Sequence, residues 1–152
     1  MRTALDTNVL VYAEGVDDPQ RQGIATDLLS RIPRERLVIS VQVLGELFNV
    51  LTRRNVPREH ARARTAYWRE ALSVYESSCE LMDMALDFAT DHKISIWDAL
   101  VLSSAVEARC DVLISEDFQD GLAWRGVTVV NPFAANPHKL LDKLLREQGN
   151  GE

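Results

Sequence analysis

The stretch TALDTNVLVYA, residues 3–13, decides the fold class of this chain. Residues 3–5 form a short apolar run suited to a buried strand, and residues 8–14 have the pattern of the first turns of a helix. Asp6 lies between them, where the strand ends. In open parallel sheets, sites lie beyond the carboxyl ends of the strands, so this junction is a candidate site. Asp6 equally suits a structural role, because aspartate often caps the free N–H groups of a following helix.

The rest of the chain continues this alternation of strands and helices. Strands are predicted at residues 37–40, 112–115 and 127–130, and helices at residues 19–32, 41–53, 57–75, 81–92, 97–110 and 136–146. The pattern predicts an α/β fold with three layers (Rossmann-like), in which helices flank a parallel sheet. Without an internal linker or repeat, residues 1–147 are expected to form a single domain and residues 148–152 a flexible C-terminal tail.

The composition is that of a globular protein, with 46% hydrophobic and 26% charged residues among 152. No apolar run approaches the roughly 20 residues that cross a bilayer, so no membrane association is expected. The two cysteines, Cys79 and Cys110, have no metal-like spacing. A reduced, cytoplasmic protein is therefore the simplest expectation.

The charge is unevenly distributed along the chain. The net charge is −6, yet residues 53–70 hold six arginines against two glutamates, or +4, which leaves −10 for the other residues. A basic segment can attract phosphates even on an acidic protein, since local potential steers a ligand. The candidate RNA contacts in it are Arg53, Arg54, Arg58 and Arg62. A solvated helix face explains the same arginines equally well.

Four acidic residues from four separate elements are the candidate catalytic and metal-binding residues. Asp6 and Asp117 lie at strand ends, although Asp117 could also simply shape a turn. Glu46 belongs to an otherwise apolar helix, where a lone carboxylate is costly unless something pairs with it. Asp98 shares a helix face with apolar residues, and its alternative role is in a capping box with Ser95.

If these four carboxylates converge, their repulsion calls for a cation among them. Oxygen ligands without cysteine or histidine favour Mg²⁺ or Mn²⁺ over zinc. Such a centre suits phosphodiester hydrolysis, because the metal activates water and neutralises the phosphate. Thr7, Asn8 and Ser115 are placed to support the carboxylates by hydrogen bonds, although turn and capping roles explain them equally well.

Several motifs resemble those of the PIN-domain family, and more narrowly of VapC-type toxins from bacterial toxin–antitoxin pairs. They are ALDTNVLVYA, SVQVLGEL, ISIWDALVLSSA, and LISEDFQDG followed by GVTVVNPF, and they appear in this order between Met1 and Phe133. The resemblance places the family's acidic positions on Asp6, Glu46, Asp98 and Asp117 and its polar helpers on Thr7, Asn8 and Ser115, with Asp120 as an extra acid.

The resemblance further implies a sheet of about five strands and an endoribonuclease dependent on Mg²⁺ or Mn²⁺. Such an enzyme cleaves tRNA, rRNA or mRNA and arrests translation. An antitoxin partner and a homodimer are also implied.

Two other functions stay open at this point. The chain could be a non-catalytic module that binds RNA or protein, or a metal-dependent nuclease that acts on DNA. Among the tryptophans, Trp97 and Trp124 are expected to pack in the core or an interface. For Trp68, packing and base stacking are equal alternatives.

Overall fold

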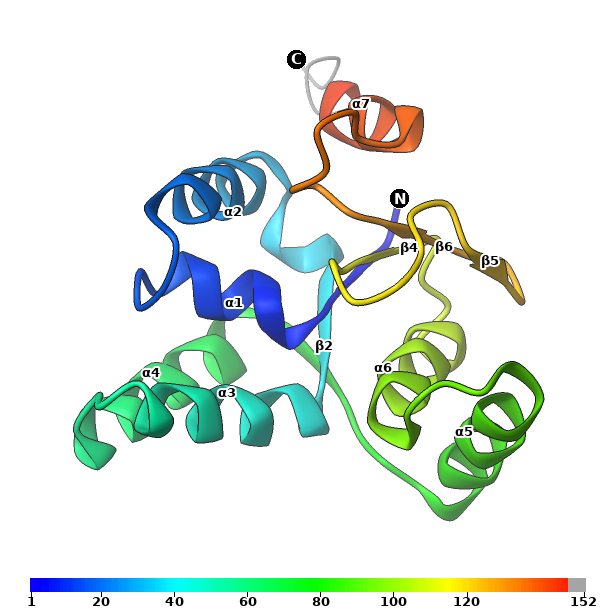
Figure 1. The fold of residues 1–152 in the computed structure, drawn as a ribbon, viewed down its shortest axis with the longest axis horizontal. Helices are drawn as coiled ribbons and strands as arrows, with labels where there is room; N and C mark the ends of the chain where they lie inside the picture. Colours follow the sequence, from blue (N-terminus) through cyan, green and yellow to red (C-terminus); the bar gives the residue numbers. More distant parts are fainter. Residues whose placement is uncertain (148–152) are drawn as a thin grey trace.

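A mostly parallel sheet forms the centre of the fold (Figure 1). The computed structural model describes residues 1–147, and the expected tail at residues 148–152 lies outside them. Within these residues the sheet has six strands in the order β3-β2-β1-β4-β6-β5, and only β5 runs antiparallel to its neighbour. The strands are β1 (Thr3–Leu5), β2 (Leu37–Ser40), β3 (Ser73–Tyr75), β4 (Val112–Ile114), β5 (Ala123–Trp124) and β6 (Val127–Val130).

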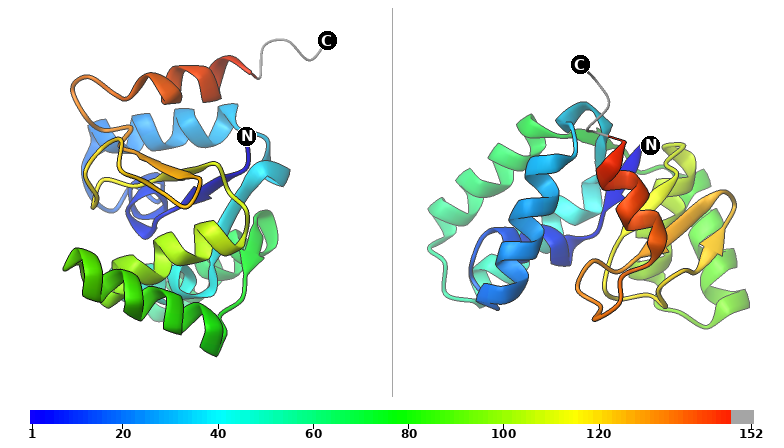
Figure 2. Two further views of the ribbon diagram at one scale, coloured as in Figure 1. Left: turned by 90° about the vertical axis from the view of Figure 1, so that its right-hand side faces the viewer. Right: turned by 90° about the horizontal axis from the view of Figure 1, so that it is seen from above.

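Helices cover both faces of this sheet. In the left view of Figure 2, α2 and α7 lie above the strands, and α5 and α6 lie below them. The helices α3 and α4 pack against each other, and α3 also packs against α1. The helices of the described residues are α1 (Thr7–Ala13), α2 (Pro19–Arg31), α3 (Val41–Arg53), α4 (Arg58–Ala71), α5 (Cys79–His92), α6 (Ile96–Glu107) and α7 (Lys139–Arg146), with a short 3₁₀ turn η1 (Arg34–Arg36). The predicted layered α/β fold is confirmed.

The middle strands are buried on both faces. Every residue of β1, β2 and β4 is buried, as expected for parallel strands covered by helices on each side. The longer helices contribute one apolar face each, and in α3 this face is Val43, Leu47 and Leu51. One hydrophobic cluster joins these layers and extends to Leu141 and Leu144 of α7.

The chain reverses its direction of travel across the sheet between β1 and β4. From β1 it proceeds outward to β2 and β3, then returns to place β4 on the other side of β1. This is a topological switch point, where neighbouring connections diverge and leave a crevice beyond the strand ends. Asp6 directly follows β1 and Ser115 directly follows β4, so both residues lie at this crevice.

The predicted helix at residues 57–75 is wrong at its C-terminal end. Helix α4 ends at Ala71, and Ser73–Tyr75 form the edge strand β3 in parallel register with Val38–Ser40. The β-branched Val74 and the aromatic Tyr75 suit extended backbone. Their pairing with β2, some 35 residues earlier, decides the outcome, and local periodicity does not contain it.

The second unpredicted strand is β5, which forms a hairpin with β6. The two residues between them, Arg125 and Gly126, have φ of 46° and 88°. Positive φ at both positions is the geometry of a tight turn whose twist matches paired strands, and glycine adopts it without strain. The sheet therefore has one strand more than the expected number of about five.

Other boundaries differ by a few residues. Helix α1 begins at Thr7 rather than residue 8, α5 begins at Cys79 after the cap Ser78, and α7 begins at Lys139 rather than residue 136. Helix α6 covers Ile96–Glu107 rather than residues 97–110. No helix within residues 1–147 is both long and apolar enough to cross a membrane.

Candidate active site

Three carboxylates from separate parts of the chain meet at the switch point of the sheet. Asp6 follows β1, Asp117 lies in the loop after β4, and Asp98 is in the first turn of α6. Each offers an oxygen, and these oxygens lie within 4.8 Å of one another. Asp6 is buried, Asp98 is half-buried and Asp117 is exposed, so the cluster leads from the interior to the surface.

Asp6 caps α1 and belongs to the cluster at the same time. Its Oδ1 accepts a hydrogen bond from the Thr7 N–H at 2.7 Å, and its Oδ2 accepts one from the Ser115 hydroxyl at 2.6 Å. The Ser115 Oγ in turn accepts the N–H of Asp117 at 3.1 Å. The capping and site roles proposed for Asp6 are therefore compatible, and one serine links two of the acids.

The surroundings of Asp6 disfavour its charged form. Burial raises the pKa of Asp6 to about 7, against the hydrogen bonds from Ser115 and Thr7, which lower it. The nearby charges of Asp117 and Asp98 raise the pKa of Asp6 further. A carboxyl that is costly to ionise becomes a good ligand once a cation offsets the repulsion.

The surroundings of Asp98 also disfavour its charged form. Burial raises its pKa, the charges of Asp117 and Glu46 add to this effect, and a hydrogen bond from Ser95 opposes it. Within residues 1–147 no ion pair involves Asp6, Glu46, Asp98 or Asp117. No cationic side chain of the described residues is thus paired with the cluster.

Glu46 stands beside the three aspartates and is held by two donors. The Thr7 hydroxyl donates to its Oε2 at 2.7 Å, and Gln42 Nε2 donates to its Oε1 at 2.5 Å. Glu46 is not among the three carboxylates that share the 4.8 Å limit, but it lines the same cleft as Asp117. This cleft, of about 360 Å³, is lined by Thr7, Asn8, Val11, Tyr12, Asp17, Glu46, Asn49, Val50, Arg53 and Asp117.

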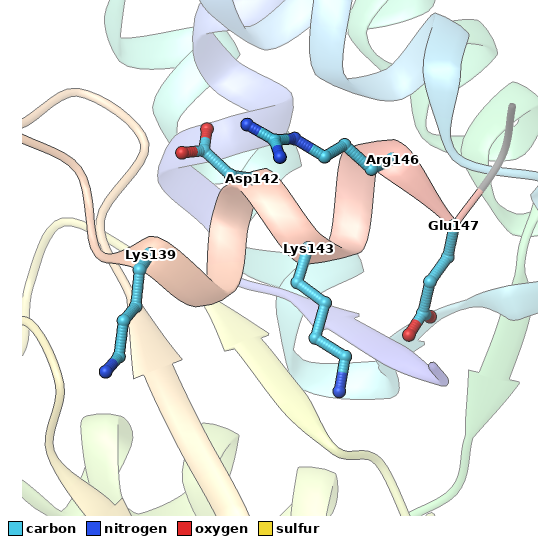
Figure 3. A pocket seen from close by; sticks show the side chains of 5 residues that line it. All are labelled: Lys139, Asp142, Lys143, Arg146 and Glu147. Carbon is cyan, nitrogen blue, oxygen red and sulfur yellow. The ribbon is translucent and has the colours of Figure 1, made fainter.

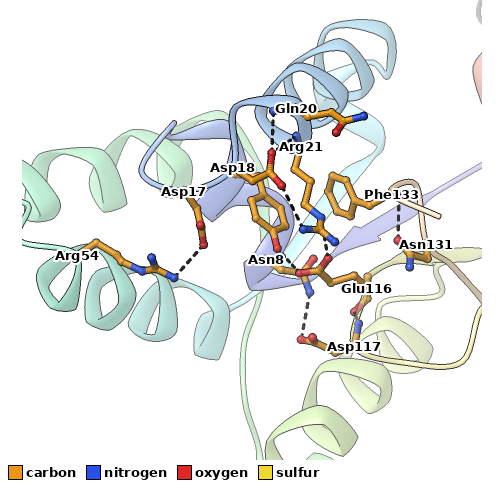
Figure 4. Close-up of polar contacts among 12 residues, drawn as sticks. Asn8, Asp17, Asp18, Gln20, Arg21, Arg54, Glu116, Asp117, Asn131 and Phe133 are labelled. Atoms are coloured by element: carbon orange, nitrogen blue, oxygen red, sulfur yellow. Dashed lines mark hydrogen bonds and ion pairs between the residues drawn. The ribbon is translucent and has the colours of Figure 1, made fainter. Parts of the chain in front are cut away.

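Asn8 supplies both a contact and a free acceptor at this cleft. Its Nδ2 donates to Asp117 Oδ2 at 3.1 Å (Figure 4). Its Oδ1 is buried and has no hydrogen-bond partner within the described residues. A water held by a cation would satisfy that oxygen. The donor set is therefore one of hard oxygens with an acceptor for an ordered water, which fits Mg²⁺ or Mn²⁺.

A network around Glu116 was not anticipated from the sequence. Glu116 accepts a hydrogen bond from the Tyr12 hydroxyl and pairs with Arg21 Nε at 3.4 Å, and the Arg21 guanidinium lies 5.9 Å from the centroid of the Phe133 ring (Figure 4). These contacts anchor the loop that carries Asp117. The partners are about 100 residues apart along the chain, and no local pattern links them.

Asp120, expected as an extra acid, lies outside the three-aspartate cluster. Its Oδ1 accepts the N–H of Asn131 at 3.0 Å. This bond ties the loop after β4 to the end of β6, so the carboxylate has a structural partner.

The four candidate arginines are not on one helix, because Arg53 ends α3, Arg54 follows it, and Arg58 and Arg62 belong to α4. Arg53 is exposed and lines the acidic cleft. Arg54 pairs with Asp17 at 2.9 Å (Figure 4). Neither Arg58 nor Arg62 lines that cleft.

The three tryptophans have different surroundings. Trp68 is buried and donates its indole N–H to Glu14 at 2.6 Å, which settles its role as packing. Trp124 is half-buried, with its ring centroid 4.2 Å from that of Phe88. Trp97 is 60% exposed, so it does not pack in the core, and its packing in an interface stays a prediction.

A separate hollow lies on α7, away from the acidic cluster (Figure 3). Its lining has mixed charge and consists of Lys139, Asp142, Lys143, Arg146 and Glu147. Glu147 also pairs with the amino terminus at 3.5 Å. Basic and acidic side chains alternate here without converging on one point, so the three-aspartate cluster is the stronger candidate site.

Comparison with known proteins gives one family match and several similar folds. The model of the PIN domain matches residues 3–119, which include all four acidic candidates. No curated protein sequence matches the chain significantly.

Three solved structures illustrate the shared fold. The sarcin–ricin loop cleaving toxin VapC20 of Mycobacterium tuberculosis has a TM-score of 0.64 at 22% identity, over 73% of this chain and 86% of that one. A toxin–antitoxin complex from Klebsiella pneumoniae has a TM-score of 0.63 at 20% identity, over 86% of this chain and 98% of that one. VapBC2 of Rickettsia felis, bound to a DNA fragment from its promoter, has a TM-score of 0.57 at 20% identity, over 77% of this chain and 89% of that one. At these identities the likeness concerns the fold.

Proposed function

The chain belongs to the PIN domain family, and we propose that it is a divalent-metal-dependent endoribonuclease, the toxin of a toxin–antitoxin pair. The observation that carries the proposal is the meeting of Asp6, Asp98 and Asp117 within 4.8 Å, with no cationic partner in the described chain. Three converging carboxylates are costly in a protein unless a cation binds them. Hydrolysis of a phosphodiester is a chemistry that such a cation serves well.

In the proposed site, Asp6, Asp98 and Asp117 hold Mg²⁺ or Mn²⁺. The bound ion would lower the pKa of a water and offset the charge of the phosphate. Asn8 keeps Asp117 oriented through its amide, and Ser115 keeps Asp6 oriented through its hydroxyl. These bonds hold the ligands in place before the substrate arrives.

Glu46 is the proposed proton acceptor. Thr7 and Gln42 each donate to a different oxygen of its carboxylate, which fixes its orientation toward the cleft. An attacking water passes its proton to this carboxylate while its oxygen bonds to phosphorus. The bond from phosphorus to the leaving oxygen breaks, and the leaving oxygen keeps the electron pair and takes a proton from solvent water. Neutral donors leave the carboxylate able to take that proton.

The proposed partners follow from the toxin assignment. An antitoxin protein is the proposed partner, supported by the toxin–antitoxin complexes among the similar folds. The proposed substrate is tRNA, rRNA or mRNA, supported by the name of the similar mycobacterial toxin. A homodimer that works in the cytoplasm completes the proposal.

The test combines cleavage with metal binding. The purified chain is incubated with end-labelled tRNA and rRNA in Mg²⁺, Mn²⁺ or EDTA, and Mn²⁺ binding is measured by calorimetry. We expect discrete fragments that require metal, and Asp98→Asn should lose the fragments and weaken Mn²⁺ binding at least tenfold. The matched control is Asp87→Asn, which alters an exposed aspartate of α5 outside the site.

Two outcomes would contradict the proposal. Intact RNA in every metal, with folded protein free of any co-purified inhibitor, would favour a binding module. Cleavage of DNA in preference to RNA would keep the metal chemistry and replace the substrate. Both substrates therefore belong in the same experiment.

A further inference from the structure

Trp97 is the large apolar side chain with the greatest exposure in the described part of the chain, at 60%. It directly precedes Asp98, so the backbone carries the indole and a candidate metal ligand on consecutive residues. Val41, which is 44% exposed, lines the same surface groove. Trp97 and Val41 thus form an exposed apolar patch within a groove that is otherwise polar, and such a patch marks a binding surface.

The groove beneath Trp97 adjoins the acidic cleft. It measures about 780 Å³ and is lined by Val41, Gln42, Gly45, Glu46, Asn49, Arg53 and Trp97. Glu46, Asn49 and Arg53 also line the cleft that contains Asp117. A ligand that occupies the acidic cleft can therefore continue into the groove without leaving the surface.

Gln42 fixes the position of Trp97 relative to the acids. Its Nε2 donates to Glu46 Oε1 at 2.5 Å and to the carbonyl oxygen of Trp97 at 3.2 Å. The first turn of α6 is also capped, since the Asp98 N–H donates to Ser95 Oγ at 3.1 Å. The indole thus stands on a backbone that is tied to α3 and to its own helix cap.

The groove is lined by residue types that are suited to binding a nucleotide. An indole face stacks on any base, and a guanidinium contacts a phosphate. Arg53 supplies the guanidinium, because it lines the groove and none of the ion pairs in the described residues involves it. The buried Gln42 Oε1, which has no partner among the described residues, leaves an acceptor in the wall of the groove.

We propose that Trp97 is a base-stacking platform next to the candidate active site. An unpaired nucleobase beside the phosphate at the acids stacks on the exposed indole, while Arg53 contacts a flanking phosphate. The proposal rests on the proposed nuclease function for its ligand. An apolar segment of a partner protein is the alternative occupant, and the polar and cationic lining by Gln42, Asn49 and Arg53 favours the nucleotide.

The test measures binding without cleavage. An eight-nucleotide single strand with 2′-O-methyl groups is titrated into the protein in EDTA, which withholds the metal that the proposed cleavage requires. Tryptophan fluorescence is followed together with the anisotropy of a label on the strand. We expect binding to quench the wild-type fluorescence, because the exposed indole stacks on a base. In Trp97→Phe the quenching should vanish while affinity stays within about threefold, since phenylalanine also stacks.

Trp97→Ala should weaken binding about 10- to 100-fold, the range expected for loss of one base stack. A strand without the stacked base, tested by placing one abasic site at each position in turn, should bind wild-type protein as weakly as the intact strand binds Trp97→Ala. The matched control is Leu86→Ala, which shortens an exposed apolar side chain on α5, outside this groove. Its affinity should equal that of the wild type.

Unchanged affinity in Trp97→Ala would overturn the proposal. A change of sedimentation mass in that variant, with unchanged affinity per chain, would instead assign Trp97 to an interface between protein chains. Failure of the nuclease proposal is separate, because it would appear as absent cleavage of unmodified RNA while the stacking signals of the modified strand persist.

Discussion

Replacing Asp6 by asparagine should remove the dependence of metal-free stability on pH that this carboxyl causes. Burial raises the pKa of Asp6 from 3.8 to about 7. Between these values the folded protein keeps a proton that the unfolded chain has lost. The stability that the folded protein gains from this proton on Asp6 is fully present below the pKa of the unfolded chain. It disappears as pH rises through the folded pKa of about 7. At ~1.36 kcal/mol per pH unit, the whole effect is about 4 kcal/mol, of which about 2.6 kcal/mol falls between pH 5 and 8.

The assay is thermal unfolding in EDTA at several pH values, for wild type and Asp6→Asn. Asparagine keeps the helix cap, because it is as good an N-cap as aspartate. We expect the melting temperature of the wild type to fall relative to the variant by roughly 5–10 °C from pH 5 to 8, at ~2–4 °C per kcal/mol. Asp87→Asn, on the exposed face of α5, should show the wild-type profile.

Addition of Mn²⁺ provides the second half of this prediction. A cation among the carboxylates favours ionised Asp6, so the wild type should regain stability at pH 8 while Asp6→Asn gains less. A constant difference between wild type and variant across the pH range would refute the reasoning. So would a wild type that becomes relatively more stable as pH rises in EDTA.

Three further variants test individual side chains. Ser115→Ala removes a donor that lowers the pKa of Asp6, so the pH profile in EDTA should shift to higher pH, and an unshifted midpoint would speak against this. Glu14→Ala leaves the buried indole N–H of Trp68 without its acceptor and also removes the ion pair of Glu14 with Arg64. The loss of these contacts should cost about 2 kcal/mol in urea unfolding, and a loss below about 0.5 kcal/mol would disprove their importance. Burial raises the pKa of Tyr12 to about 12, so its hydroxyl stays protonated at neutral pH, and Tyr12→Phe should lose about 1 kcal/mol in the same assay. An equal stability of the two proteins would contradict that estimate.

The acids and their helpers could be predicted because their signals are local. Asp6 follows the end of a strand, where sites of parallel sheets lie. Glu46 is a lone carboxylate on an apolar helix, where burying a charge is costly. Both signals can be read before any contact is known. The structure brings Asp6 into the cluster with Asp98 and Asp117, and Thr7, which was predicted as a helper, donates to Glu46. Their roles in catalysis and metal binding remain proposals.

What local patterns miss is the identity of partners across the fold. Hydrophobic periodicity tells which face of a helix is buried, but it does not tell what the other face meets. The exposure of Trp97 depends on which elements pack around the start of α6, and the contact of Gln42 with its carbonyl spans 55 residues. Likewise, β3 exists because β2 offers an open edge. A single sequence does not encode these pairings in any short window.

Two of the predicted helpers, Thr7 and Asn8, show why the site should form only with the fold. Thr7 donates to Glu46 across 39 residues, and Asn8 donates to Asp117 across 109. Glu46 and Asp117 are thus each oriented by a residue from another element, and the unfolded chain has no comparable arrangement to bind a cation. Mn²⁺ at 100 times its dissociation constant should therefore stabilise the folded protein by about 2.7 kcal/mol. In Asp98→Asn the same concentration should give little stabilisation, because the variant lacks a ligand although its fold remains.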